Sequence, residues 1–139
     1  MDPNIVLSGD TRWTAGIVLL TILFIEWGGL FMLRVVRGRQ PMTDFQKAFV
    51  RAGHAHAGVL VTLALVCLIL ADAADLSGLL VIFGRNGIWA VAILMPAGFF
   101  FSSMGKGVTS HNRLIGLVYA GAVSLGLGVA SLGVRLLTT

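Results

Sequence analysis

Two histidines stand at the start of a long apolar stretch, in the run Arg51-Ala-Gly-His54-Ala-His56. The apolar residues continue to Ala71, so this segment is about 20 residues long, which is enough to cross a bilayer. Ionisable side chains are rare inside membrane helices, and they usually mark a proton path, a ligand or a polar contact between helices. An imidazole can exchange protons near neutral pH and can bind transition metals. We therefore take this stretch as the functional end of the protein.

Glu26, inside an earlier apolar stretch, is the second ionisable residue placed for chemistry. It lies eight residues before Arg34, which is about 12 Å along a helix. An ionised carboxylate that faces lipid is unfavourable, so we expect Glu26 to face a cavity or a polar partner. It is either a proton-accepting or metal-binding carboxylate or an interhelical hydrogen bond that fixes the register. The expected partners on the next helix are His54, Arg51 and Thr62.

The two helix histidines cannot act as a pair on a regular helix. Residues two apart are separated by about 200° of rotation, so their side chains point to opposite sides. His54 shares its side with Gly58 and Thr62, and we expect His54 to face the bundle and His56 to face lipid or a neighbour. The third histidine, His111, is either a ligand or an interfacial residue that caps the last helix.

The composition places these residues in an integral membrane protein. The chain has 139 residues, of which 57% are hydrophobic and 12% are charged, whereas a soluble domain has about 25% charged residues. The length suits a single domain. The formal net charge of +4 comes from cations between the apolar stretches, whose partners are water and anionic lipid headgroups rather than nucleic acid. The single cysteine, Cys67, cannot form an internal disulfide.

Four apolar stretches predict four transmembrane helices, over about residues 13–36, 52–71, 88–104 and 114–137. Short connections between them favour an all-α, up-down four-helix bundle. The apolar segment 76–83 is too short to cross a bilayer, and the turn residues Gly84-Arg85-Asn86-Gly87 follow it. We expect this segment to be interfacial or re-entrant, between helices two and three.

The positive charges predict the orientation in the membrane. Seven of the ten Lys and Arg residues flank two of the connecting segments: Arg34, Arg37, Arg39, Lys47, Arg51, Lys106 and Arg113. The positive-inside rule makes these segments cytoplasmic and puts both termini outside, in what we expect to be a bacterial cytoplasmic membrane. Glu26, the two helix histidines and His111 then fall in the cytoplasmic half of the bundle.

The fourth helix carries small residues at regular spacing. One row recurs every four residues and consists of Gly116, Ala120, Ser124 and Gly128; a second row is Ala122, Gly126 and Ala130. Such rows let two helix backbones approach closely in a membrane. They predict that the fourth helix is central or lies at a subunit interface. The alternative is that membrane helices are generally rich in glycine and alanine.

The run around His54 also resembles the histidine-bearing helix starts of the haem-copper oxidase and nitric oxide reductase superfamily, and of small uncharacterised membrane proteins similar to it. In that superfamily a histidine after an arginine ligates a haem, and a second histidine comes from another helix. The resemblance implies that His54 or His56, with His111, are candidate axial ligands of haem b or of a transition metal. The chain departs from the family because it has four helices rather than twelve and lacks the paired histidines of the copper site, so oxygen reduction is not implied.

Three functions remain open at this point. The first is an accessory or structural subunit of a larger membrane complex, or a homo-oligomer. The second is a haem- or metal-binding electron-transfer protein that uses His54 and His111. The third is a proton-coupled carrier, acting as an oligomer, in which Glu26 and His54 relay protons. The sequence has no complete catalytic motif, which favours the first function and disfavours an enzyme.

Overall fold

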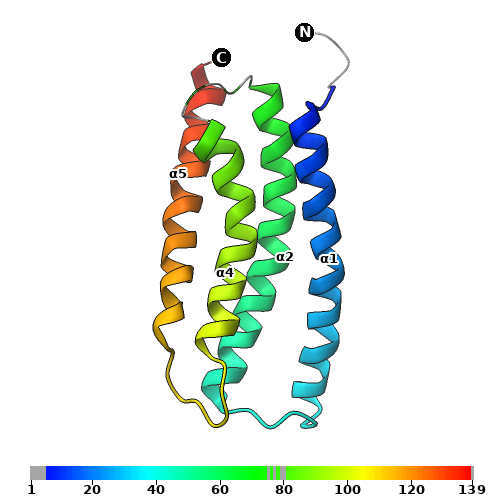
Figure 1. Ribbon diagram of the computed structural model, residues 1–139, viewed down its shortest axis with the longest axis vertical. Coiled ribbons are helices and arrows are strands. Elements are labelled where there is room, and N and C mark those ends of the chain that lie inside the picture. Colours follow the sequence, from blue (N-terminus) through cyan, green and yellow to red (C-terminus); the bar gives the residue numbers. More distant parts are fainter. Residues whose placement is uncertain (1–5, 75, 77, 79–80, 139) are drawn as a thin grey trace.

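The computed structural model describes residues 6–74, 76, 78 and 81–138, and these are helical apart from short connections. Four helices are long and apolar enough to cross a membrane, which confirms the predicted fold class. The helices run alternately up and down, so both termini lie at one end and two connecting loops lie at the other (Figure 1). The chain is therefore a small integral membrane protein with distinct terminal and loop ends.

The first helix, α1, spans Gly9–Val36 and begins four residues before the predicted start at 13. Ser8 caps it, because its hydroxyl oxygen accepts a hydrogen bond from the backbone N–H of Thr11 at 3.2 Å. The helix ends where Gly38 adopts a φ of 68°, a left-handed conformation that glycine tolerates best.

The second helix, α2, spans Asp44–Ala73 and begins eight residues before the predicted start at 52. A capping box sets this start: the backbone N–H of Gln46 donates to the Thr43 hydroxyl, and the N–H of Thr43 donates to the Gln46 side chain, both at 3.2 Å. α2 therefore extends two turns beyond its apolar stretch at the loop end, and carries Lys47 and Arg51 on the added turns.

The third membrane-crossing segment consists of the π-helical η1, Ile82–Gly87, followed by α4, Ile88–Ser102. The predicted turn at 84–87 is wrong, because the helix runs through it. Its glycines serve packing instead: a Cβ on Gly84 would lie 3.1 Å from the side chain of Leu76, and a Cβ on Gly87 would lie 3.2 Å from the Ser124 hydroxyl. Residues 77, 79 and 80 of the expected re-entrant segment, 76–83, lie outside the described residues.

The last helix, α5, spans Gly116–Thr138 and follows the short 3₁₀ segment η2, Arg113–Ile115. Across the view of Figure 1 the helices stand in the order α5, α4, α2 and α1, and the contacts follow the same order. In the most apolar stretch of each helix, 39% of the residues are buried in α2 and in the third segment, but only 6% in α1 and 11% in α5. The core thus lies between α2 and α4, and α1 and α5 are edge helices.

Of the two positions predicted for α5, central or at a subunit interface, the first is not found within the chain, because α5 is an edge helix. Only part of its first small-residue row packs against a neighbour. The Ser124 hydroxyl donates to the carbonyl of Gly87 at 3.2 Å. A Cβ on Gly128 would lie 2.5 Å from Cγ1 of Ile88, so the backbones are in close contact there. The remaining residues of the two rows are exposed: Gly116, Ala120, Ala122, Gly126 and Ala130.

A polar cluster around Asp72 joins the helices at the terminal end. The Asp72 carboxylate accepts hydrogen bonds from the N–H and the hydroxyl of Ser8, at 2.8 and 3.0 Å, and an ion-paired hydrogen bond from Arg85. The side chains of Arg85 and Asp72 are only 15% and 8% exposed. Nearby, Nε of Arg135 donates to the carbonyl of Ala74 at 3.1 Å. Segments α1, α2, η1 and α5 are all tied together by these few bonds.

Candidate functional site

His54 lies in the seam between α2 and α1, against a pair of glycines. A Cβ built on Gly28 would stand 3.4 Å from Nδ1 of His54, and one on Gly29 would stand 3.6 Å from Cε1. A Cβ at either position would therefore be in van der Waals contact with the imidazole, and a larger side chain would meet the ring. The Gly28-Gly29 pair lets α1 approach α2 closely while a ring remains between them.

A groove opens beside this ring on the outer surface of α1 and α2. Its volume is about 710 Å³. The walls are mostly apolar and are formed by Ile25, His54, Ala55, Gly58, Val59, Thr62, Leu63 and Val66. The Thr62 hydroxyl is used within its own helix, because it donates to the carbonyl of Gly58 at 3.1 Å. His54 makes no hydrogen bond to any described residue, so its imidazole is the polar group in the groove that still needs a partner.

His56 faces a different neighbour, α4. Its ring centroid lies 5.0 Å from that of Phe99, and its Nδ1 donates to the carbonyl of Ala52 at 2.8 Å, which places a proton on that nitrogen. The sequence predicted that His54 faces the bundle and that His56 faces lipid or a neighbour; in the structure His54 packs against α1 and His56 against α4. The helix is continuous here, and Gly53 serves close packing, since its Cβ would lie 3.1 Å from Cβ of Phe99.

Glu26 lies on the exposed side of the edge helix α1. It follows Ile25, which lines the groove. Within the described part of the chain it forms no hydrogen bond or ion pair, and neither do Arg51 and His54. The expected contacts of Glu26 with the second helix are therefore not formed, and its side chain is exposed.

His111 is also separate from the helix histidines. It is exposed in the loop between α4 and α5, and its Nδ1 donates to the carbonyl of Asn112 at 3.3 Å. No hydrogen bond links it to His54 or His56, and among the described residues no group of three or more His, Cys, Asp or Glu could hold a metal ion.

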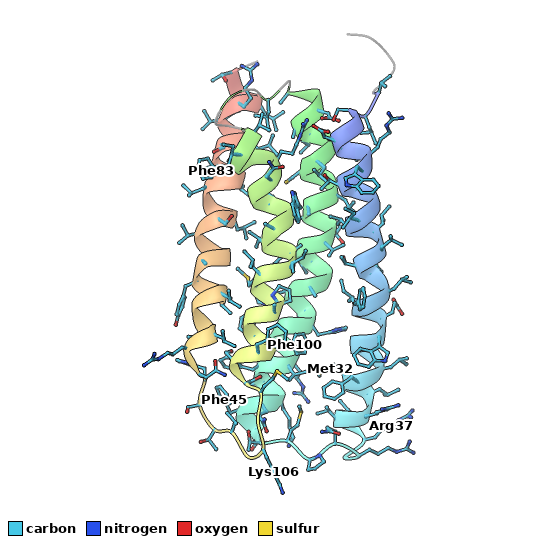
Figure 2. All side chains as sticks on the ribbon, viewed as in Figure 1. Met32, Arg37, Phe45, Phe83, Phe100 and Lys106 are labelled. Carbon is cyan, nitrogen blue, oxygen red and sulfur yellow. The ribbon has the colours of Figure 1, made fainter. Side chains whose placement is uncertain are left out.

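The loop end is strongly basic. Figure 2 shows Arg37 and Lys106 at this end and Phe83 near the opposite end. The only acidic residue in the segments 34–51 and 103–113 is Asp44, and its carboxylate is 3.1 Å from the ammonium group of Lys47. The other six cations flanking these loops have no acidic partner at this end of the described chain. A positive potential results on this side of the membrane protein.

Sequence reasoning missed the residues that fix the loops. Gln46 is buried, and its amide donates to the carbonyls of Ser103 and Gly105 at 3.0 and 2.7 Å. Asn112 donates to the carbonyl of Phe101 at 2.9 Å. The Thr-x-x-Gln pattern at 43–46, just after Pro41, is a signal that identifies the capping box. No local pattern pairs Asp72 with Arg85, because the contact depends on how the two helices pack.

No protein-family model, no curated protein and no solved structure matches this chain.

Proposed function

We propose that the protein is an accessory or structural subunit of a larger membrane assembly, and that it docks through the face carrying Glu26 and the His54 groove. The observation that supports this most strongly is the exposed, unpartnered position of Glu26 on α1. Insertion of an acidic or basic side chain at the centre of a membrane helix costs about 2.5–3.5 kcal/mol. A helix that keeps such a residue on its outer face gains stability when another protein covers it.

The depth of Glu26 strengthens this argument. It lies ten residues before the end of α1 and eight before Arg34, so it is about 12 Å inside the basic rim. The hydrocarbon layer is about 30 Å thick, which puts the carboxylate near its middle. A glutamate side chain is too short to reach the interface from there.

Trp27, the next residue along α1, extends the exposed surface of the helix beyond Glu26, about 100° further round. It is 72% exposed and lies at nearly the same depth as Glu26. Tryptophan in membrane proteins is concentrated at the two interfaces, whereas buried tryptophans are frequent anchors of protein–protein contacts. An outward tryptophan near the bilayer centre is therefore better suited to a protein partner than to lipid.

The partner we propose is a transmembrane helix that brings a hydrogen-bond donor to the depth of Glu26. Hydroxyl, amide or cationic side chains would meet this need, and such contacts stabilise helix pairs in membranes by about 0.6–2 kcal/mol. His54 can exchange a hydrogen bond with the same helix along the groove. A second copy of the chain is less suitable, because a symmetric contact through this face would bring two Glu26 carboxylates together.

We also propose that the basic loop end is cytoplasmic and that both termini are outside. The seven cations at the loop end, out of ten in the chain, support this orientation under the positive-inside rule.

The docking proposal is tested by purifying the tagged chain from its native membrane in a mild detergent. We expect the wild type to elute with a partner at fixed stoichiometry and Glu26→Leu to elute alone. Asp10→Asn, an exposed acidic residue in the first turn of the same helix, is the matched control and should retain the partner. A wild-type protein that elutes alone, and whose stability is unchanged by Glu26→Leu, would contradict the proposal.

A further inference from the structure

The two loops at the basic end enclose a hollow that is separate from the docking face. Its volume is about 600 Å³. It is lined by Gln40, Pro41, Met42, Thr43, Gln46, Gly105, Lys106 and Gly107. A water molecule in the liquid takes about 30 Å³, so the hollow has room for a small organic anion.

Hydrogen bonds between the loops fix the walls of this hollow. The buried Gln46 donates to the carbonyls of Ser103 and Gly105, and the Thr43 hydroxyl donates to the carbonyl of Val108. Gln46 and Thr43 belong to the capping box that starts α2. The start of α2 and the loop after α4 are therefore joined by hydrogen bonds on both sides of the hollow.

The far wall has donors available for an anion. Lys106 carries a full positive charge and is exposed, and it stands between two glycines with φ of 130° (Gly105) and 69° (Gly107). The backbone N–H groups of residues 105–107 donate to no described residue. A Cβ on Gly107 would meet nothing within 4 Å, so the chain is open to approach at this point.

The positive charge of the two loops favours an anionic ligand in this hollow. Seven cations flank these loops and the single nearby acid, Asp44, is already paired with Lys47. The residues lining the hollow lie in the chain between Arg34 and Arg51 and in the loop after Ser102, so they stand at the ends of the apolar stretches. This is the level at which the phosphates of membrane lipids are found, and clusters of basic residues there attract anionic lipids.

We propose that this hollow binds a phosphate group, with Lys106 as its charged contact and the free amides of residues 105–107 as further donors. The phosphate belongs either to the headgroup of an anionic phospholipid or to a soluble phosphate monoester. The site does not depend on the docking of a partner to α1.

The test is a binding titration of the purified full chain in detergent micelles, read by native mass spectrometry. Dioleoyl phosphatidylglycerol and glycerol 3-phosphate are the two probes, and dioleoyl phosphatidylcholine is the reference. We expect at least one of the two probes to bind more tightly than phosphatidylcholine. Lys106→Gln should weaken that binding about fivefold, which corresponds to the loss of one cation at a membrane surface.

Arg113→Gln removes the same charge at the same end but outside the lining of the hollow, and it should change the affinity less than twofold. Binding of phosphatidylglycerol alone would assign the site to a lipid, and binding of glycerol 3-phosphate would assign it to a soluble ester. The proposal is overturned if phosphatidylcholine binds as tightly as both anions. It is also overturned if Lys106→Gln and Arg113→Gln have equal effects, because attraction would then be diffuse.

Discussion

The imidazole of His54 lies against the backbone of Gly28, with Nδ1 3.4 Å from the position that a Cβ would take. A histidine on one edge of α2 is thus matched to a glycine on α1. The contact brings α1 close enough to form a groove while leaving the imidazole without a hydrogen bond inside the described chain. His54 is in this way directed toward the groove on the outer surface of the α1–α2 pair.

Enlarging Gly28 should separate the two helices. Gly28→Leu would force its side chain into the ring of His54, and overpacking of this kind costs about 1–3 kcal/mol. We expect the midpoint of thermal unfolding in detergent to fall, and the double variant Gly28→Leu/His54→Ala to recover part of the loss. Gly16→Leu on the same helix, where a Cβ meets nothing within 4 Å, is the control. Equal losses for the two leucine variants would show that the ring contact is unimportant.

The ion pair between Asp72 and Arg85 should stabilise the fold far more than the exposed pair between Asp44 and Lys47 at the loop end. Asp72→Ala leaves a largely buried guanidinium without its partner, which should lower the free energy of unfolding by about 3–5 kcal/mol. Removing both charges in Asp72→Leu/Arg85→Leu should be less destabilising than the single change. Asp44→Ala, which breaks the exposed pair with Lys47, should cost less than about 1 kcal/mol. Thermal unfolding of the four proteins in one detergent compares them.

Replacement by alanine should destabilise the protein at one glycine of α5 and not at another. A Cβ on Gly128 would lie 2.5 Å from Cγ1 of Ile88 and 2.8 Å from the carbonyl oxygen of Phe83, so Gly128→Ala must shift a backbone and should cost about 1–3 kcal/mol. Gly126 has nothing within 4 Å, and Gly126→Ala should leave the unfolding midpoint unchanged or slightly higher. A reversed order would mean that α5 packs through its other row.

The proposed orientation, with both termini outside, predicts which end of the protein a membrane-impermeant thiol reagent can reach. Thr138→Cys, at the terminal end, should react in intact cells, and Lys106→Cys should react only after the membrane is permeabilised. The native Cys67 is buried and should stay unlabelled in both cases. Labelling of Lys106→Cys in intact cells, with Thr138→Cys protected, would reverse the assignment.

The sequence was sufficient for the parts of the fold that depend on continuous apolar length. Four membrane-crossing helices and their alternation follow from the apolar stretches, because each needs about 20 residues to cross the bilayer. The sequence was misleading at 84–87, where two glycines and an asparagine favour a turn locally. In the structure, close packing of this segment against Leu76 and Ser124 stabilises a helix.

The candidate site was only partly predictable for a related reason. The two-residue spacing of His54 and His56 is enough to separate them around a helix. Which helix each one meets depends on the order of helices in the row, which no local pattern specifies. The expected contact of Glu26 assumed a closed bundle, whereas α1 stands at the edge and has a free outer side.

A photo-reactive benzophenone amino acid in place of Trp27, introduced in the native membrane, reports what covers Glu26. If another protein docks there, irradiation gives one cross-linked protein product of discrete mass, and Glu26→Leu in the same chain abolishes it. The same residue placed at Leu137, which is 89% exposed on α5, should not give that product. Cross-links from position 27 to lipid alone, unchanged by Glu26→Leu, would contradict the assignment of this protein as a docked subunit.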